Sequence, residues 1–298
     1  MFNQLPNSVL QMSMIFLSIV IEAFPFVLLG CIISGALYVF LTPERVNAFL
    51  PKNKFASILV GCLLGVFFPS CECGIVPIVN QFVKKDVPEH TAFAFMLTAP
   101  IVNPIVIFST FIAFGNSARY AILRVLGSLF VAIVIGTWLA YVNKKPILKQ
   151  VVVREAKHSS DTQEKPTFWQ QIQRVLHHSI DEFFDTGRYL MIGGLLAAAM
   201  QTYLPTGVML TLGSNKLLAV LVMLFLAVVM SLCSEADAFI GSSLLSLFGT
   251  GPVVGFLVFG PMVDIKNLLM MNRYFNKKFI ASMVGLILLC VTGYALIV

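Results

Sequence analysis

Long apolar stretches alternate with short polar connections along almost the whole chain, and they predict membrane-spanning helices. About 20 apolar residues are needed to cross a bilayer as a helix. Stretches long enough for a full span lie at 9–40, 91–114, 118–142, 168–203, 253–271 and 279–298. Two further pairs of short apolar runs, within 55–83 and 217–248, are interrupted by polar residues. We therefore predict six spans and two re-entrant helical hairpins, with ten complete crossings as the alternative.

The first hairpin is interrupted by Phe-Pro-Ser-Cys-Glu-Cys-Gly-Ile-Val-Pro, residues 68–77. Proline and glycine stop a helix, so the backbone is expected to open here at membrane depth. Irregular backbone is tolerated at that depth only where it is buried in protein or lines a wet cavity. A carboxylate such as Glu72 costs about 2.5–3.5 kcal/mol near the bilayer centre and usually marks a pathway. The stretch therefore predicts the working centre of a transporter.

The two halves of the chain carry matching landmarks in the same order, about 160 residues apart. The matched pairs are Glu22 with Glu182, Cys71 with Cys233, and Asn103 with Asp264. Paired interrupted segments in two halves are the best sequence indication of a transport site. We therefore predict a first membrane repeat at 1–142, a cytoplasmic linker at 143–167 and a second membrane repeat at 168–298.

The charges of the connections predict the topology. Nearly all loop Lys and Arg residues lie at 42–54, 84–90, 143–167 and 272–278. These connections share one face if each hairpin returns to its own side, and the positive-inside rule makes that face cytoplasmic. Each half then crosses three times, so the repeats are inverted and both termini lie outside a bacterial plasma membrane.

Composition supports an all-α polytopic membrane protein. The 298 residues are 58% hydrophobic and 11% charged, with a mean hydropathy of +0.90, whereas soluble domains carry about 25% charged residues. The net charge of +6 needs no nucleic acid, because basic cytoplasmic loops and anionic lipid explain it. The lipid bilayer is thus the expected partner, and the oligomeric state is not indicated.

Two opposed hairpins would bring their interrupted tips together near the midplane. The candidate substrate-binding residues there are Cys71, Glu72, Cys73, Cys233, Glu235 and Asp237. The helix after each tip directs its positive end at the thiols, which favours thiolate. Thiolates select soft ions such as trivalent arsenic, Cu(I) or Zn(II). We therefore predict a metal or metalloid site at Cys71, Cys73 and Cys233, with Glu235 as a further ligand.

The alternative interpretation is that the cysteines are small buried hydrophobes, which suits Cys31, Cys62 and Cys290. The same ambiguity holds for Asn103 and Asp264, which follow a proline in the two broken spans. They could bind substrate or carry a proton, or they could cap backbone groups freed at the kink.

His177 and Asp181 are spaced for one face of the helix at 168–203. They are a candidate metal-acquiring pair, although the wet face of an interfacial helix is the favoured explanation.

The elements Phe-Pro-Ser-Cys-Glu-Cys-Gly-Ile-Val-Pro, at 68–77, and Leu-Thr-Ala-Pro-Ile-Val-Asn-Pro, at 97–104, resemble a known family. It is the bacterial predicted permease family that includes the ArsP-type organoarsenical efflux permeases, and the chain looks closest to its Bacillus-type, YraQ-like branch. The resemblance implies a plasma-membrane permease, with arsenical efflux in some members and with Cys71 and Cys73 as the matching cysteines. It also implies that a second, smaller membrane subunit often accompanies members of this branch.

Three functions remain open at this point. The first is export of a soft, thiol-seeking solute such as a trivalent organoarsenical. The second is transport of a divalent soft ion such as zinc, which the intramembrane carboxylates favour. The third is a membrane thiol–disulfide oxidoreductase using Cys71, Cys73 and Cys233, although the sequence has no quinone or flavin signature and CxC is not the usual redox pair. We therefore expect a transporter without cofactors, not an enzyme.

Overall fold

The computed structural model describes residues 7–41, 50–68, 72–143, 147–148, 168–203 and 216–298. These residues form α-helices joined by short connections, and Leu148 and Phe275 form an isolated bridge. The predicted all-helical class is confirmed. Cys71 lies outside the described residues, as does nearly all of the linker.

The described helices form two sets of six. The first set is α1 (Asn7–Phe40), α3 (Lys54–Phe67), α4 (Glu72–Lys84), α5 (Glu89–Val102), α6 (Pro104–Ala113) and α7 (Ala118–Tyr141). The second set is α9 (Phe168–Tyr203), α11 (Lys216–Met230), α12 (Ser234–Phe248), α13 (Thr250–Phe259), α14 (Ile265–Tyr274) and α15 (Lys277–Ile297). Each helix of the second set begins about 160 residues after its counterpart, in the same order, as the sequence repeat predicts.

Three described helices, α1, α7 and α15, are long and apolar enough to cross a membrane. The bent pair α5 and α6, which meet at 40°, makes a fourth if it counts as one span. Helix α9 has 36 residues but carries charged side chains along its first half. The fold is therefore that of a membrane protein, while the count of six spans and two hairpins stays a prediction.

The predicted helix breaks have local causes. Helices α5 and α6 are separated by Asn103, and Pro104 opens α6 at a position where proline fits because no helical N–H bond is lost. Helices α13 and α14 are separated by residues 260–264. Ser231, between α11 and α12, has φ of +46°, a left-handed conformation that a residue with a side chain rarely adopts. The chain therefore passes from α11 to α12 through an unfavourable backbone conformation.

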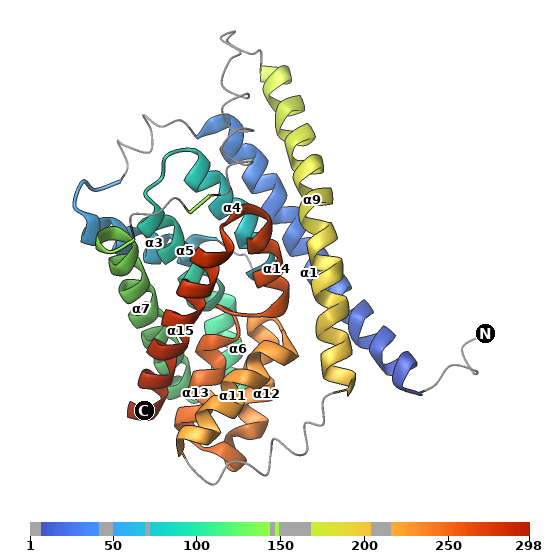
Figure 1. The fold of residues 1–298 in the computed structure, drawn as a ribbon, viewed down its shortest axis with the longest axis vertical. Helices are drawn as coiled ribbons and strands as arrows, with labels where there is room; N and C mark the ends of the chain where they lie inside the picture. The colour runs from blue at the N-terminus through green and yellow to red at the C-terminus, as the bar shows by residue number, and fades with distance from the viewer. Residues whose placement is uncertain (1–6, 42–49, 69–71, 144–146, 149–167, 204–215) are drawn as a thin grey trace.

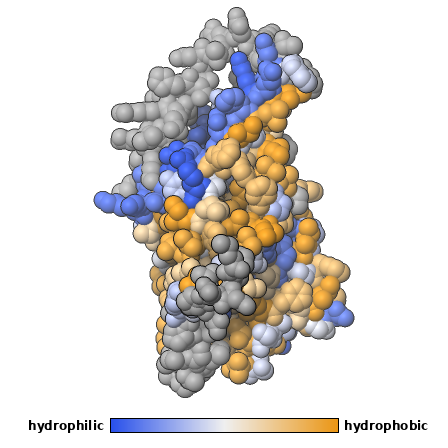
Figure 2. Space-filling view, turned by 90° about the vertical axis from the view of Figure 1, so that its right-hand side faces the viewer, coloured by the Kyte–Doolittle hydropathy of each residue, from blue (hydrophilic) through white to orange (hydrophobic). Residues whose placement is uncertain are grey.

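The two longest helices, α1 and α9, lie side by side along one flank of the molecule (Figure 1). Helices α3, α5 and α7 pack together, and so do their counterparts α11, α13 and α15. The start of α1 and the end of α15 lie toward the same end of the bundle, and the turn between α4 and α5 lies at the other. Figure 2 shows hydrophilic residues gathered mainly toward the upper end, above a broad hydrophobic surface. The hydrophobic surface is what a bilayer-embedded protein presents to lipid.

Helix α1 contacts α4 backbone to backbone. A Cβ atom added at Gly30 would lie 2.3 Å from the carbonyl oxygen of Gly74, and one added at Gly74 would lie 2.5 Å from the carbonyl oxygen of Phe26. Glycine lets the two helices approach this closely, as small residues do in membrane helix pairs. Helix α4 is therefore held tightly against α1.

Candidate transport site

The tips of the two predicted hairpins meet at the first residues of α4 and α12. Ser234, the first residue of α12, donates a hydrogen bond from Oγ to Oε2 of Glu72, the first residue of α4, at 3.2 Å. Both side chains are 1% exposed. Glu72 follows Cys71 directly and Ser234 follows Cys233, so the contact joins the two segments that the sequence singled out.

A buried arginine connects the second hairpin to the rest of the bundle. Arg124 of α7 donates to the carbonyl oxygens of Ser234 at 2.9 Å and Leu257 at 3.1 Å, and to Oγ1 of Thr110 at 2.8 Å. Its side chain is 1% exposed, and a buried charge is costly unless it is paired and hydrogen-bonded. The carboxylates of Asp237, Glu235 and Glu72 all act electrostatically on it. Arg124 thus supplies the positive charge of an acidic centre.

Asp237 completes this centre from the first turn of α12. It is buried, and its Oδ2 lies close to the backbone of Gly260, where an added Cβ would approach it to 2.7 Å. That oxygen has no hydrogen-bond partner among the described residues. Glu235, two residues earlier, is half-buried. Both predicted acidic residues of the second tip therefore lie near Arg124.

Asn103 and Asp264 occupy equivalent places at the two broken helices. Asn103 caps α6 by accepting from the N–H of Ile105 at 3.0 Å, and Asp264 caps α14 by accepting from the N–H of Asn267 at 2.5 Å. The capping explanation is therefore confirmed for both. Asp264 also lies 4.0 Å from the ammonium of Lys266, and both of these charges act on Glu72. A role of either residue in substrate binding remains a prediction.

The cysteines are less closely grouped than the acidic residues. Cys73 and Cys233 are both buried, and the Cys233 thiol donates to Oε1 of Glu22 on α1. Among the described residues, no three Cys, His, Asp or Glu side chains are placed to hold a metal ion. Because Cys71 lies outside that part of the chain, the set of Cys71, Cys73, Cys233 and Glu235 remains a prediction.

His177 and Asp181 form an exposed pair on α9, with Nδ1 and Oδ2 3.1 Å apart. Asp185, the next acidic residue on that face, contacts Arg188 and Arg273 instead. The geometry is that of a solvated helix face, and the pair lies apart from the hairpin tips.

Sequence reasoning missed two groups of buried polar residues. Arg124 lies inside the apolar stretch 118–142, five residues beyond Arg119 at its start, and a charge this far into an apolar stretch was the available indication of a role. Ser34, Asn80 and Gln81 are also buried and lie beside Glu182. Uncharged residues of this kind are common in membrane helices, so the sequence did not distinguish them.

Buried ionisable side chains between interrupted, apolar helices define the class of integral membrane transporters, because intramembrane charges of this kind line substrate or ion pathways. Comparison of sequences gives the same answer. The profile of a family described as "Predicted permease" matches residues 8–298, and the chain belongs to this family.

Two relatives cover almost the whole chain. A Streptococcus mutans protein named as a subunit of a two-component membrane permease complex is 54% identical over 297 residues, covering 100% of this chain and 98% of that protein. The Bacillus subtilis protein named UPF0718 protein YcgR is 47% identical over 292 residues, covering 98% of each chain. No solved structure matches the chain.

Proposed function

We propose that this permease exports a soft, thiol-binding solute, such as a trivalent organoarsenical or a similar metalloid species, through a site between the tips of α4 and α12. The observation that supports this best is the contact between Glu72 and Ser234. It joins the residues that directly follow Cys71 and Cys233 in the sequence, and we propose that a thiol from each of these two segments binds the solute. Sulfur ligands select soft ions over hard ones.

The same contact supports the inverted repeat. Glu72 and Ser234 are 162 residues apart, which is the offset that relates the two halves. When two halves are related by a two-fold axis, equivalent residues contact each other only at that axis. The proposed transport site therefore lies on the axis between two inverted repeats, where such transporters bind their substrates.

Zinc transport is the second candidate, and the acidic side chains at the site favour it. The Cys233 thiol faces the carboxylate of Glu22, and Glu72 and Asp237 are buried nearby. Zinc accepts carboxylate ligands as well as thiolates and is usually four-coordinate. Trivalent arsenic would use three sulfurs or fewer, so a carboxylate would matter less for it.

A second membrane subunit is part of this proposal. The relative from S. mutans is named as a subunit of a two-component membrane permease complex, and this chain matches it over its full length. We therefore propose that the chain works together with another membrane protein in the bacterial plasma membrane, with both of its own termini outside.

The test is a panel of metals and metalloids given to cells with and without the protein, together with its partner subunit where one is encoded. Growth sensitivity and cell-associated content should change for one soft species, with lower content in cells that have the protein. Cys71→Ser, Cys73→Ser and Cys233→Ser should each weaken transport by about 10- to 100-fold or more, the range seen when a metal site loses a supporting contact.

Cys290→Ser is the matched control, because Cys290 is only partly buried and lies on α15. It should leave transport unchanged. Equal activity of all four variants would contradict a thiol site. In the zinc case Glu235→Gln should also reduce transport, and in the arsenical case it should not.

A further inference from the structure

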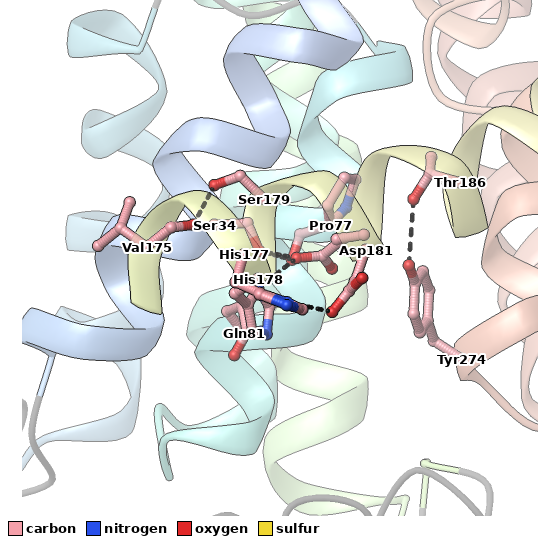
Figure 3. A network of polar contacts seen from close by, with 11 residues as sticks. Ser34, Pro77, Gln81, Val175, His177, His178, Ser179, Asp181, Thr186 and Tyr274 are labelled. Carbon is pink, nitrogen blue, oxygen red and sulfur yellow. Dashed lines mark hydrogen bonds and ion pairs between the residues drawn. The ribbon is translucent and has the colours of Figure 1, made fainter. Parts of the chain in front are cut away.

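A second cluster of buried polar side chains lies between α1, α4 and α9 (Figure 3). Ser34 Oγ donates to Oε2 of Glu182 and lies 3.4 Å from the carbonyl oxygen of Pro77. His178 Nδ1 is 3.4 Å from the same Glu182 oxygen. The other ring nitrogen, Nε2, is 3.1 Å from Nε2 of Gln81. Glu182 and Gln81 are both buried, so water does not solvate this chain of contacts freely.

These contacts define which hydrogens the imidazole carries. A side-chain amide nitrogen can only donate, so Nε2 of His178 must accept from Gln81. The ring hydrogen then lies on Nδ1, which is 3.4 Å from Oε2 of Glu182 but makes no hydrogen bond among the described residues, and the imidazole is neutral. The oxygen of the same amide, Oε1 of Gln81, is buried without a hydrogen-bond partner among the described residues. The amide oxygen of Gln81 is therefore an acceptor that is not in use.

That free oxygen permits a second arrangement. A half-turn of the Gln81 amide would bring Oε1 to His178 Nε2, and an oxygen there accepts a hydrogen where the nitrogen donated one. A protonated imidazole donates from both nitrogens. It would then donate from Nε2 to Gln81, and its positive charge would face the Glu182 carboxylate, whose Oε2 lies 3.4 Å from Nδ1. The two arrangements differ by one bound proton and one amide rotation.

Other titratable and charged groups face this pair from each neighbouring helix. They are Lys84 at the end of α4, Lys85 directly after it, Asp181 of α9, Cys31 and Tyr38 of α1, and Tyr274 of α14. Tyr38 stacks on the His178 ring, with centroids 4.3 Å apart, and the Lys85 ammonium lies over Tyr38 at 5.0 Å. Burial lowers the pKa of Lys85. The positive charges of Lys84 and Lys85 disfavour binding of a further large positive charge by the cluster. The cluster therefore suits a single proton better than a metal cation.

Helix α4 joins this cluster to the hairpin tips. Glu72 is its first residue, and Pro77 and Gln81 lie about one and a half and two and a half turns further along. Ser34 and His178 contact α4 at these two residues. A change in hydrogen bonding at Gln81 therefore acts on the helix that carries one side of the proposed transport site.

We propose that Glu182 and His178 form a proton-binding site that couples transport to proton movement, an inference that rests on the function proposed above. One proton from water binds Nε2 of neutral His178, and the Gln81 amide turns so that Oε1 accepts it. Release of the proton to water reverses both steps, and no other bond or charge changes.

The direct test observes histidine protonation and does not depend on any substrate. The protein contains four histidines, so ¹⁵N-imidazole signals of the full chain in nanodiscs are few, and His178→Gln assigns one of them. We expect His178 as the Nδ1–H tautomer at high pH. We also expect it to gain a proton as the pH is lowered. Glu182→Gln should move this titration to lower pH, because it removes the carboxylate that stabilises the charged ring.

His90→Gln is the control, since His90 lies at the start of α5, and it should leave the His178 signal unchanged. An Nε2–H tautomer at His178, or a ring that binds no proton at any pH at which the protein stays folded, would overturn the proposal. Gln81→Met provides a second variant, because it fills similar space without an acceptor and should lower the midpoint of the His178 titration.

Transport gives the functional readout. In proteoliposomes loaded with the species found by the panel, an imposed pH gradient should change the wild-type rate, and Glu182→Gln should remove that response. A wild-type transport rate that does not change with the imposed pH gradient would overturn the proposed coupling. If the soft-solute function failed instead, the histidine signals would still report the proton site, so the two failures are distinguishable.

Discussion

Helices α4 and α12 have equivalent places in the two halves but very different surroundings. In α4 every residue from Glu72 to Phe82 is buried. In α12 the buried residues are Ser234, Asp237, Ala238, Gly241 and Phe248, while Phe239 and Leu247 are exposed. Helix α1 covers α4, whereas its counterpart α9 packs chiefly against α1 and α14. Helix α4, in the first predicted hairpin, is therefore enclosed, and α12, in the second, is partly open.

This difference indicates that the surroundings of α4 and α12 are set by the arrangement of the long helices rather than by their own sequences. Transporters with inverted repeats alternate by moving one repeat or bundle against the other around a fixed site. On the inverted repeat proposed above, a covered α4 and a partly uncovered α12 would correspond to one state of such a cycle. Four pairs of substitutions test how each predicted hairpin is held, from the largest expected effect to the smallest.

Arg124→Met should have the largest effect, because it removes the cation that fixes α12 and leaves the buried carboxylates uncompensated. Breaking a buried ion pair or network by removing one partner typically costs about 3–5 kcal/mol. The measurement is equilibrium unfolding in mixed detergent micelles. Arg119→Met, at an exposed position on the same helix, should change the unfolding free energy by less than about 0.5 kcal/mol. Similar losses in both variants would show that Arg124 does not anchor the open hairpin.

Gly74→Ala tests the enclosed hairpin. The new methyl group would lie 2.5 Å from the carbonyl oxygen of Phe26, so α1 and α4 must separate, at a cost of about 1–3 kcal/mol. At Gly187 of α9 nothing lies within 4 Å of an added Cβ. Gly187→Ala should therefore raise the unfolding free energy by up to about 1 kcal/mol, because alanine has the higher helix propensity. In the same assay, the unfolding free energy should fall in Gly74→Ala and rise in Gly187→Ala. A rise in both variants would mean that α1 does not pack closely against α4.

Ser234→Ala tests the contact between the two hairpins. It removes the hydrogen bond to Glu72, which should cost about 1 kcal/mol of unfolding free energy. Ser242→Ala is the control, because that hydroxyl bonds only within α12, to the carbonyl oxygen of Phe239. An equal effect of the two variants would indicate that the contact at the tips adds nothing to stability.

The smallest effect is expected for Ser243→Leu on the exposed side of α12, within about 0.5 kcal/mol of the wild type. The equivalent residue of α4 is Gln81, which is buried against His178. Gln81→Leu removes the donor to the imidazole and should cost about 1 kcal/mol. If the two substitutions had the same effect on unfolding, the difference in surroundings between α4 and α12 would not extend to this turn.

The sequence was sufficient for the features that arise locally. Prolines and glycines interrupt apolar stretches, so the helix breaks near Asn103 and Asp264 could be predicted, and a side-chain oxygen beside a break is suited to capping. The order of the helices in the two halves followed from matched landmarks. Such inferences need only neighbouring residues.

The sequence was insufficient where partners are distant. The carbonyl oxygens that Arg124 contacts lie 110 and 133 residues away, and Ser34 is 148 residues from Glu182. No local pattern indicates which remote backbone an arginine will meet. The unequal burial of α4 and α12 was also unpredictable, because it depends on how two long helices pack.

The contact between Glu72 and Ser234 has a consequence for ancestry. If the two halves descend from one duplicated gene whose product paired with itself, the residue at this position once faced its own copy. Two glutamates in that dry position would repel each other and resist ionising together, whereas a glutamate facing a serine forms a hydrogen bond. A single fused chain lets the two copies mutate independently. Fusion would thus have allowed one carboxylate, rather than none or two, at the point where the halves meet.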